Sequence, residues 1–570
     1  MLKVVTVEQM RAIEEATDAA GVSYAAMMQR AGGAVAEVVR RMVVELPDGG
    51  RVVVLVGPGN NGGDGLVAAR ILAEQTEAEV RACLLKPRDE SDQVYADAVD
   101  AGVSMTVASE DGDWEMLRQL VTSADILIDA LLGTGARLPV EGELKALLEN
   151  ASAAMGRPVE DEWLDAGLVW PAAPLEAVER GPVVVAVDCP SGLDSDTGEL
   201  DPAALPADVT VTFAAAKVGQ LKFPGAAAVG ELVVADIGTP PDLAELQAVT
   251  VEMADGASVG RMLPRRSADS HKGTYGTVLA IAGSANYVGA VGLLGEAAYR
   301  VGAGLVTLAI PATIYPMLAS SLQEATWILL PQDMGVVNVG ALTVLRDEFK
   351  KRAGAVLLGP GLGQEEPTET FIRGLFQGRG QAKRGQIGFV SSAPANPAAP
   401  SHEFEIGAPL VIDADGLNNL SQIDEWWKLL PAGTILTPHP GEMARLCGTD
   451  VEEVLADRSG LVVEKAREWK ATIVLKGAYT LVASAEGRLV VIPFATDALA
   501  TAGTGDVLAG CITGLLAQGM APFDAAVAGA YLHGLAGRIA GEALNSRATI
   551  ASDVLAALPA ALSLVERPAG

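Results

Sequence analysis

The sequence contains few cysteines, few histidines and few aromatic residues. Of its 570 residues, 4 are cysteine, 4 are histidine and 4% are aromatic. The cysteines lie far apart in the chain, which excludes both the density of a disulfide scaffold and the ligand spacing of a zinc site. We therefore expect a reducing compartment, and the cytoplasm is the simplest location.

Two further features are missing, namely a long apolar run and an excess of basic residues. The N-terminus has no apolar core of signal-peptide length, and no later stretch is an uninterrupted span of membrane length. The chain carries 41 Lys and Arg against 72 Asp and Glu, a formal net charge of −31. This charge repels nucleic acid and anionic membranes, so we expect neither as a partner. Small-molecule ligands and a homo-oligomer remain as expected partners.

The residues that are abundant favour an α/β fold. Half of the chain is hydrophobic, and Gly alone accounts for 63 residues, which is typical of α/β layers with strands buried on both faces. A chain of 570 residues is longer than a domain with a single hydrophobic core usually is, so we expect at least two domains. We predict a Rossmann-like three-layer α/β/α domain over residues 1–240, a linker over 241–258 and a second α/β domain over 259–570.

A glycine-rich turn at residues 57–65 is the clearest local motif. It follows an apolar strand that begins at Val52 and precedes a helical pattern from Leu66. Residues 57–62 match the G-x-G-x-x-G dinucleotide fingerprint, which alone would suggest an NAD-dependent dehydrogenase. Asn60, Asn61 and Asp64 add oxygen-bearing side chains that suit a cation or ribose hydroxyls. The alternative is a plain βα turn that uses Asn and Asp as turn formers.

Two later strands of the first half also end on an acid and a turn. Asp129 closes the predicted strand Ile126–Ala130, and Asp188 follows the predicted strand Val183–Val187. Ligands of open α/β sheets bind beyond the carboxyl ends of the strands. Three such endings in one domain therefore indicate a site.

The second half repeats this pattern. Five predicted strands, at 277–282, 355–358, 410–412, 434–436 and 472–475, each lead to a glycine or polar turn. We expect a second parallel sheet with one rim of functional loops. Residues 157–181 and 380–401 do not follow the alternation of strands and helices. We interpret the first segment as an insertion and the second as an excursion of the chain from the domain.

The loop Gly503-Thr-Gly-Asp506 leads into an apolar helix. Its backbone N–H groups would form an anion hole for a transferring phosphoryl group, with Asp506 as the base. A helix N-cap is the alternative. Lys476 suits a nucleotide phosphate, and Glu442 is either a water-mediated Mg²⁺ contact or an acid of the first helical turn.

Together these motifs resemble a known family. Asn60-Asn-Gly-Gly-Asp64, Asp129 with Gly133-Thr-Gly135, and Asp188-Cys-Pro-Ser-Gly192 resemble the N-terminal epimerase domain of the bifunctional NAD(P)H-hydrate repair enzymes. The motifs at 359–363, 413–418, 439–442 and 503–506 resemble their C-terminal dehydratase domain, which has a ribokinase-like fold. The two sets of motifs occur in the same order along this chain as the two domains do in the family.

The resemblance implies that the first domain interconverts the R and S epimers of NADH or NADPH hydrated across the nicotinamide 5,6 bond. Asp188 would be the acid/base, Lys217 is a weaker candidate for substrate contact, and K⁺ would be held by Asn61, Asp129 and Ser191. The implied substrate contacts are Asn60, Asn61, Gly62, Gly63, Asp64, Gly133, Thr134, Gly135, Ala136, Arg137, Leu138, Pro139 and Asp188.

For the second domain, the resemblance implies dehydration of the S epimer to NAD(P)H, with ADP or ATP as phosphate donor, Mg²⁺ as cofactor and Asp506 as base. The implied hydrate contacts are Ala290, Gly361, His439 and Asp506. The implied nucleotide contacts are Lys476, Gly477, Ala478, Tyr479, Thr480 and Gly505. One departure is Ala502, which stands before Gly503 where many family members have a second glycine.

A second function remains open. A small-molecule kinase of the ribokinase class, with a binding or scaffold domain at its N-terminus, would share the loop that ends at Asp506. It does not account for the motifs at 60–64 and 188–192.

Overall fold

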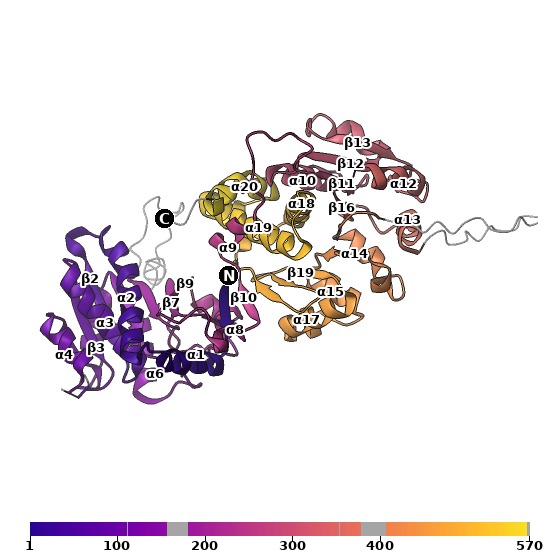
Figure 1. Ribbon diagram of the computed structural model, residues 1–570. Helices are drawn as coiled ribbons and strands as arrows, with labels where there is room; N and C mark the ends of the chain where they lie inside the picture. Colours follow the sequence, from indigo (N-terminus) through magenta and orange to yellow (C-terminus); the bar gives the residue numbers. More distant parts are fainter. Residues whose placement is uncertain (90, 111, 157–180, 353, 378–405, 567–570) are drawn as a thin grey trace, which may run out of the picture. The chain divides into compact units, whose positions relative to one another are not determined.

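The computed structural model describes residues 1–89, 91–110, 112–156, 181–352, 354–377 and 406–566. They form two compact units, Leu2–Thr250 and Val251–Gly570, with Met1 grouped with the second (Figure 1). Both units are layered α/β structures, as the sequence predicts. The predicted insertion at 157–181, except Gly181, and the predicted excursion at 380–401 lie outside the described residues.

The first unit is built on a parallel sheet. In spatial order, its described strands are β4 (Ser104–Val107), β3 (Glu79–Leu84), β2 (Arg51–Val56), β5 (Ile126–Ala130), β6 (Val183–Val187), β7 (Val209–Phe213) and β9 (Glu231–Ala235). Val52, Val54 and Val56 pack into one apolar cluster and Val53 and Leu55 into another, because successive side chains of a strand point to opposite faces. Both faces of the sheet are therefore covered.

Helices cover the two faces of this sheet. α2 (Tyr24–Val43), α3 (Asn60–Gln75) and α4 (Gln93–Asp100) contribute to one cluster, and α5 (Glu115–Ser123) and α6 (Gly142–Ala154) to the other. α1 (Val7–Ala19) begins at a Thr6 capping box, and β1 (Leu2–Val5) pairs with β8 (Ala216–Lys217).

The start of α3 corrects one prediction. The helix begins at Asn60, six residues before the predicted start at Leu66, so Asn60 to Asp64 are its first five residues. α3 packs closely on β5 through Gly65, where a methyl group would overlap Ala130. The polar groups at the start of α3 are thereby held at the carboxyl end of the sheet.

The second unit has a mixed sheet. In spatial order, its strands are β13 (Thr326–Leu330), β12 (Leu305–Pro311), β11 (Thr277–Ile281), β16 (Ala355–Leu358), β17 (Leu410–Ile412), β18 (Ile435–Leu436), β19 (Thr472–Leu475), β20 (Leu481–Ala483), β21 (Leu489–Val491) and β10 (Val251–Met253). The five predicted strands correspond to β11, β16, β17, β18 and β19, which pair in parallel as the sequence predicts. β20 is antiparallel to both of its neighbours, so the sheet as a whole is mixed. The short 476–480 connection turns the chain back, whereas a parallel strand would need a long crossover.

Small residues let the helices of this unit pack tightly. α10 (Val288–Arg300), α18 (Thr504–Ala517), α19 (Pro522–Leu544) and α20 (Ala551–Glu566) share one apolar core. The other described helices are α9 (Gly256–Met262), α11 (Tyr315–Leu318), α12 (Ala341–Arg352), α13 (Glu366–Gln377), α14 (Asp415–Leu420), α15 (Pro440–Cys447), α16 (Val451–Ala456) and α17 (Arg458–Trp469). Residues 241–258, predicted as a linker, include α8 (Ala244–Gln247), β10 and the start of α9.

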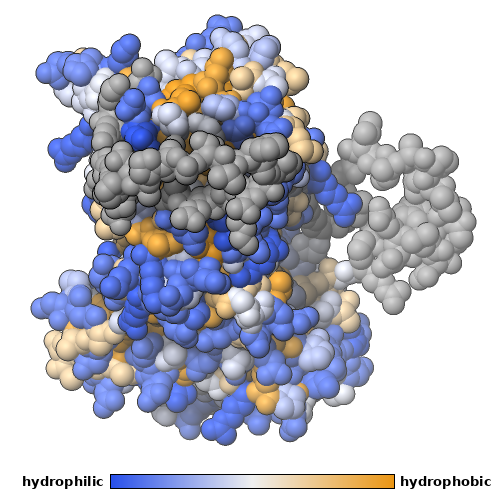
Figure 2. Space-filling model, turned by 90° about the vertical axis from the view of Figure 1, so that its right-hand side faces the viewer, coloured by the Kyte–Doolittle hydropathy of each residue, from blue (hydrophilic) through white to orange (hydrophobic). Residues whose placement is uncertain are grey.

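The surface is rich in polar residues. The face shown in Figure 2 is mostly hydrophilic, with apolar residues in scattered patches. Among the described residues, no helix has both the length and the apolar character needed to cross a membrane.

Candidate active sites

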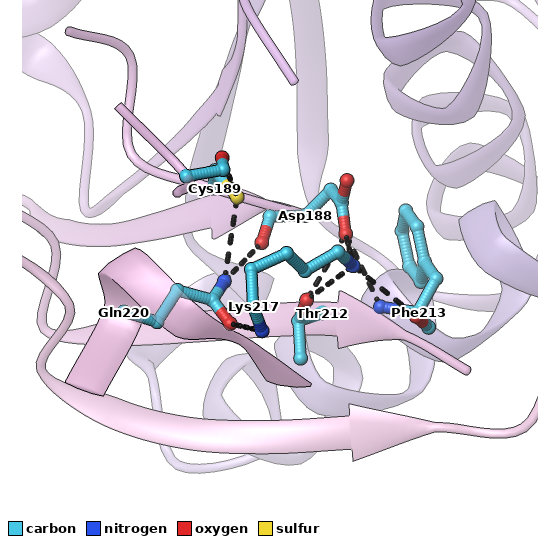
Figure 3. Close-up of polar contacts among 7 residues, drawn as sticks. Asp188, Cys189, Thr212, Phe213, Lys217 and Gln220 are labelled. Carbon is cyan, nitrogen blue, oxygen red and sulfur yellow. Dashed lines mark hydrogen bonds and ion pairs between the residues drawn. The ribbon is translucent and has the colours of Figure 1, made fainter. Parts of the chain in front are cut away.

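The first candidate site centres on Asp188, which directly follows β6. Its φ of +63° is a left-handed conformation that is uncommon for any residue with a side chain. Oδ1 accepts hydrogen bonds from Thr212 Oγ1 at 3.0 Å and from Phe213 N at 3.2 Å, and it pairs with Lys217 Nζ (Figure 3). Oδ2 has no partner among the described residues and points away from Lys217 in Figure 3. One oxygen is thus fixed and the other is available for proton transfer.

Lys217 is fully buried beneath Asp188. Besides the ion pair, its Nζ donates to Thr212 Oγ1 at 2.7 Å and to Phe213 O at 3.2 Å. An ammonium group has three protons, so these partners saturate it. Lys217 therefore orients Asp188, and its ammonium has no free proton for a substrate.

Two other polar residues that the sequence did not single out complete this support. Thr212 lies in β7, and Gln220 lies in η3 (Val218–Leu221). Gln220 Nε2 donates to Asp188 O at 2.7 Å, and its Oε1 accepts from Lys217 N at 2.8 Å (Figure 3). The side chain of Gln220 thus holds the backbone of both charged residues.

Asp129 and Ser191, two of the predicted cation ligands, are in direct contact. Asp129 is fully buried. Its Oδ1 accepts from Ser191 Oγ at 2.7 Å and from Leu131 N at 3.2 Å, and its Oδ2 accepts from Ser191 N at 2.8 Å. Burial raises the pKa of Asp129, although these hydrogen bonds act against the increase. No basic side chain of the described residues pairs with this carboxylate.

Asn61, the third predicted cation ligand, reaches the turn that follows Asp129. A Cβ atom at Gly133 would lie 3.1 Å from Asn61 Oδ1. Asn61 Nδ2 is buried and has no hydrogen-bond partner among the described residues. The amide of Asn61 is therefore set against the β5 turn with unused hydrogen-bonding capacity.

Asp64 is a further buried acid of this site. Its pKa is raised well above the ordinary value, mainly by burial and then by the charges of Asp188 and Glu14. Glu14, on α1, has a raised pKa for the same reasons, burial first and Asp188 second. Glu14 carries no motif, so sequence reasoning missed it.

The glycine turn and the β5 turn border the same end of the sheet. Arg88 Nη2 donates to Gly57 O at 2.9 Å and to Gly59 O at 2.8 Å, which pins the glycine turn. The predicted substrate contacts at 133–139 form a partly exposed turn after β5. Arg88 was not predicted from the sequence.

The second candidate site contains a buried ion-pair cluster. Lys476 Nζ lies 2.7 Å from Asp413 Oδ1 and 3.5 Å from Glu442 Oε2. Burial lowers the pKa of Lys476, but the two carboxylates raise it by more, so the net shift is upward. The lysine stays charged and joins the ends of β17 and β19 to α15.

Asp506 lies in the first turn of α18, as the sequence predicts. The preceding cap residue, Gly503, has φ +91°, a conformation that favours glycine. Burial, followed by repulsion from Asp413, raises the pKa of Asp506 to about 7, while Lys476 acts in the opposite direction. A carboxyl group with this pKa can exchange a proton near neutral pH.

His439 and Glu442 cap helix α15 together. His439 Nδ1 accepts from Gly441 N at 3.0 Å, and Glu442 Oε2 accepts from His439 N at 2.8 Å. Burial, then Lys476 and Arg445, lower the pKa of His439, which favours the neutral ring. Glu442 is thus an acid of the first helical turn that also faces Lys476.

The predicted hydrate contacts Ala290 and Gly361 are neighbours. A Cβ atom at Gly361 would lie 3.3 Å from Ala290 Cβ. The turn that contains Gly361 is braced by Asp415, whose Oδ2 accepts from Gly363 N at 2.9 Å.

A cavity of about 200 Å³ lies beside the start of α18. Five of the six predicted nucleotide contacts line it, namely Lys476, Gly477, Ala478, Thr480 and Gly505. Tyr479 is not in its lining, and its N–H donates to Phe494 O at 2.9 Å. His533, which the sequence did not identify as a site residue, also lines this cavity.

These features define a two-domain α/β enzyme with acid–base groups at the carboxyl ends of the strands of each sheet. Comparison with known sequences assigns it to a family. Residues 24–219 match the family described as YjeF-related protein N-terminus, and residues 278–382 and 391–559 match NAD(P)H-hydrate dehydratase.

Full-length relatives carry both parts. The chain is 35% identical over 550 residues to the bifunctional NAD(P)H-hydrate repair enzyme Nnr of Moorella thermoacetica, covering 95% of this chain and 92% of the relative. It is 34% identical over 567 residues to the enzyme of the same name from Thermofilum pendens, covering 98% and 96%. The chain belongs to the family of bifunctional NAD(P)H-hydrate repair enzymes, which confirms the predicted resemblance.

Solved structures also match part of the chain. The ADP/ATP-dependent NAD(P)H-hydrate dehydratase of Bacillus subtilis, co-crystallized with ATP/Mg²⁺, is 28% identical and matches with a TM-score of 0.44. The match covers 56% of this chain and 100% of that structure.

Proposed function

We propose that this chain repairs hydrated NADH and NADPH in two steps. The first unit interconverts the R and S hydrates at C6 of the nicotinamide ring. The second unit uses ADP to dehydrate the S hydrate, which gives NAD(P)H, AMP and phosphate. Membership of the repair-enzyme family supports this assignment. The observation that carries it is the presence of two separate acid sites, at Asp188 and at Asp506.

In the first site, Asp188 acts as the acid/base. Inversion at C6 needs a proton to assist departure of the hydroxyl group and a group to accept a proton when water returns on the other face. Asp188 Oδ1 is fixed by three donors, which leaves Oδ2 for this exchange. Asp64, whose raised pKa favours the protonated form, offers a hydrogen-bond donor to the hydrate.

A potassium ion fits the residues at Asp129. A fully buried carboxylate without a basic partner is unfavourable unless a cation compensates its charge. Asp129 and Ser191 supply oxygen atoms there, and the Asn61 amide adjoins the same turn. When bound, the ion would neutralise Asp129 and fix the turns that carry the substrate contacts, while Asp188 performs the proton transfer.

In the second site, Asp506 acts as the base for phosphoryl transfer. Hydroxide is a poor leaving group, so the C6 hydroxyl must first be converted to a phosphate ester. Asp506 takes the hydroxyl proton, and the backbone N–H groups at the start of α18 stabilise the transferring phosphoryl group. The ring nitrogen then expels phosphate, and loss of the C5 proton restores the double bond.

Mg²⁺ would be held mainly by the nucleotide. The described residues contain no group of three or more His, Cys, Asp or Glu side chains that could hold a metal ion. Mg²⁺ in nucleotide enzymes is commonly bound by phosphates, water and one or two carboxylates. Glu442, which already faces Lys476, would contribute through a water molecule.

We also propose a cytoplasmic homo-oligomer. The free cysteines of the described residues fit a reducing compartment, and light scattering of the purified protein would measure the assembly size. A monomeric mass in that measurement would remove the oligomer from this proposal.

Turnover of the hydrates tests the function directly. The protein is supplied with mixed NADHX epimers and either ADP or ATP, and the return of NADH absorbance is followed. Both epimers should be consumed, whereas Asp188→Asn should leave the R hydrate to its spontaneous epimerisation. If neither nucleotide restores NADH, a small-molecule kinase with an N-terminal scaffold domain becomes the better reading.

A further inference from the structure

The cavity beside α18 contains a histidine that has no role in the steps above. His533 lies in α19, is 8% exposed and lines the cavity together with the predicted nucleotide contacts. Its Nε2 is buried and has no hydrogen-bond partner among the described residues. A buried polar atom without a partner is unfavourable unless a ligand supplies one.

The His533 ring is neutral. Burial lowers its pKa to about 4, and Lys476 contributes in the same direction. A hydrogen bond with the backbone of Thr504 acts against this shift, as expected for a ring N–H that donates to a carbonyl group. A neutral imidazole has only one N–H, so its other nitrogen is an acceptor. We assign that acceptor to Nε2, the nitrogen without a partner.

The remaining walls of the cavity suit a flat ring. Ile492, Phe494, Leu499 and Leu508 are all in its lining. Gly534 keeps Phe494 close to α19, because a methyl group at this position would overlap the phenyl ring. Pockets of this kind bind a ring by apolar contact and orient it with a few polar groups.

Another part of the lining is suited to phosphate. It contains Lys476 and Gly505, and a Cβ atom at Gly505 would lie 3.7 Å from Lys476 Nζ. An ammonium group beside a helix N-terminus attracts anions. The cavity therefore offers Lys476 and helix N–H groups in one part, and apolar side chains together with the unpaired His533 Nε2 in another.

We propose that His533 Nε2 accepts a hydrogen bond from the exocyclic amino group of adenine and so selects adenine nucleotides. This inference rests on the proposed use of a nucleotide by the second unit. Adenine presents an amino donor at C6 of the purine, whereas guanine and hypoxanthine present a carbonyl oxygen. If a purine carbonyl oxygen faced Nε2, two hydrogen-bond acceptors would oppose each other. His533 Nε2 would then remain without a hydrogen-bond donor.

The test compares ADP with IDP, which differs at this purine position. The dehydration kcat/KM is measured with each nucleotide for the parent protein, His533→Leu and His533→Asn. The parent should prefer ADP by roughly 30-fold or more, because a buried acceptor rejects a ligand that lacks the donor. His533→Leu should lower kcat/KM for ADP about 10-fold and bring the ADP/IDP ratio close to one. His533→Asn provides an amide donor as well as an acceptor and should improve IDP.

Controls separate this inference from the function on which it rests. His271→Leu replaces an exposed histidine whose Nδ1 accepts from Gly273 N, and it should leave the ADP/IDP ratio unchanged. Epimerase activity and thermal unfolding of each variant report whether the chain is folded, and calorimetry measures ADP binding without the hydrate. Absence of turnover with both ADP and ATP in the parent would contradict the proposed function. Turnover with ADP and an ADP/IDP ratio in His533→Leu equal to that of the parent would overturn the role of His533.

Discussion

Lys476 and Asp413 form an ion pair between the ends of two strands, with Nζ 2.7 Å from Oδ1. The Asp413 side chain is only 2% exposed, and Glu442 Oε2 lies 3.5 Å from the same Nζ. A single ammonium group thus compensates two buried carboxylates. Both charges of the pair shift the pKa of Asp506, since Asp413 raises it and Lys476 opposes that increase. The pair therefore links the stability of the second unit to its acid–base chemistry.

Removal of the lysine should destabilise this unit. Lys476→Met leaves Asp413 and Glu442 buried without their cation, and breaking such a pair costs roughly 3 kcal/mol in the free energy of unfolding. The measurement is urea unfolding of the full chain. Lys428→Met, which breaks the exposed pair with Glu425, is the control and should cost less than about 1 kcal/mol. Equal effects of the two variants would contradict the role of Lys476.

The dehydration step should depend on the protonation of Asp506. As a base, Asp506 must be deprotonated, so kcat/KM should rise with pH and level off above the pKa of about 7. Asp506→Asn should lower the rate at least about 100-fold while epimerisation continues. A pH profile that is flat between pH 5 and pH 8 would remove Asp506 as the base.

The raised pKa of Asp506 also predicts that the chain becomes less stable as the pH rises, whereas its dehydration rate increases. Between the ordinary value of 3.8 and the folded value of about 7, the folded chain binds the Asp506 proton more tightly than the unfolded chain. The free energy of unfolding contributed by this group therefore falls as the pH rises through that window. Asp506→Asn should be more stable than the parent at pH 8, and the difference should shrink at pH 5. Urea midpoints at the two pH values measure it, with Asp415→Asn as the comparison.

Asp188 and Lys217 should show strong coupling. Asp188→Asn leaves the Lys217 ammonium fully buried without its anionic partner, which should lower the free energy of unfolding by about 3 kcal/mol. Lys217→Met alone should also be destabilising. The double variant should be more stable than the sum of the two losses predicts, by about 1–3 kcal/mol. Additive losses would mean that the ion pair does not hold Asp188 in place.

The sequence predicts the central strands well for a physical reason. Ile126–Ala130 and Val183–Val187 are found at the predicted residues. They are apolar runs buried on both faces between polar or glycine turns, so composition alone marks their ends. β20 and β21 were not predicted, because each has only three residues and the two form an antiparallel pair outside the pattern of the parallel strands.

The supporting residues of the sites could not be predicted in the same way. Gln220 contacts Asp188 across 32 positions of sequence, and Arg88 reaches Gly57 across 31. Such contacts depend on the tertiary fold and leave no periodic pattern. His533 lies in a small-residue helix, where its sequence context resembles packing. Its unpaired Nε2 becomes visible only in the three-dimensional structure.

The proposed potassium site predicts a specific ion dependence of stability. A ligand that binds only the folded state raises the free energy of unfolding by RT ln(1 + [L]/Kd), which is about 1.4 kcal/mol at ten times Kd. KCl should therefore stabilise the first unit more than tetramethylammonium chloride at equal ionic strength, because the larger cation cannot enter a site formed by Asn61, Asp129 and Ser191.

Two variants serve as controls. Asp129→Asn removes the buried charge and should abolish the difference between the two salts. Asp208→Asn should keep that difference, because Asp208 is an acid outside the proposed site that accepts a hydrogen bond from Val184 N. Thermal unfolding of the parent and both variants in the two salts measures this. A parent protein that unfolds at the same temperature in both salts would remove potassium from the site.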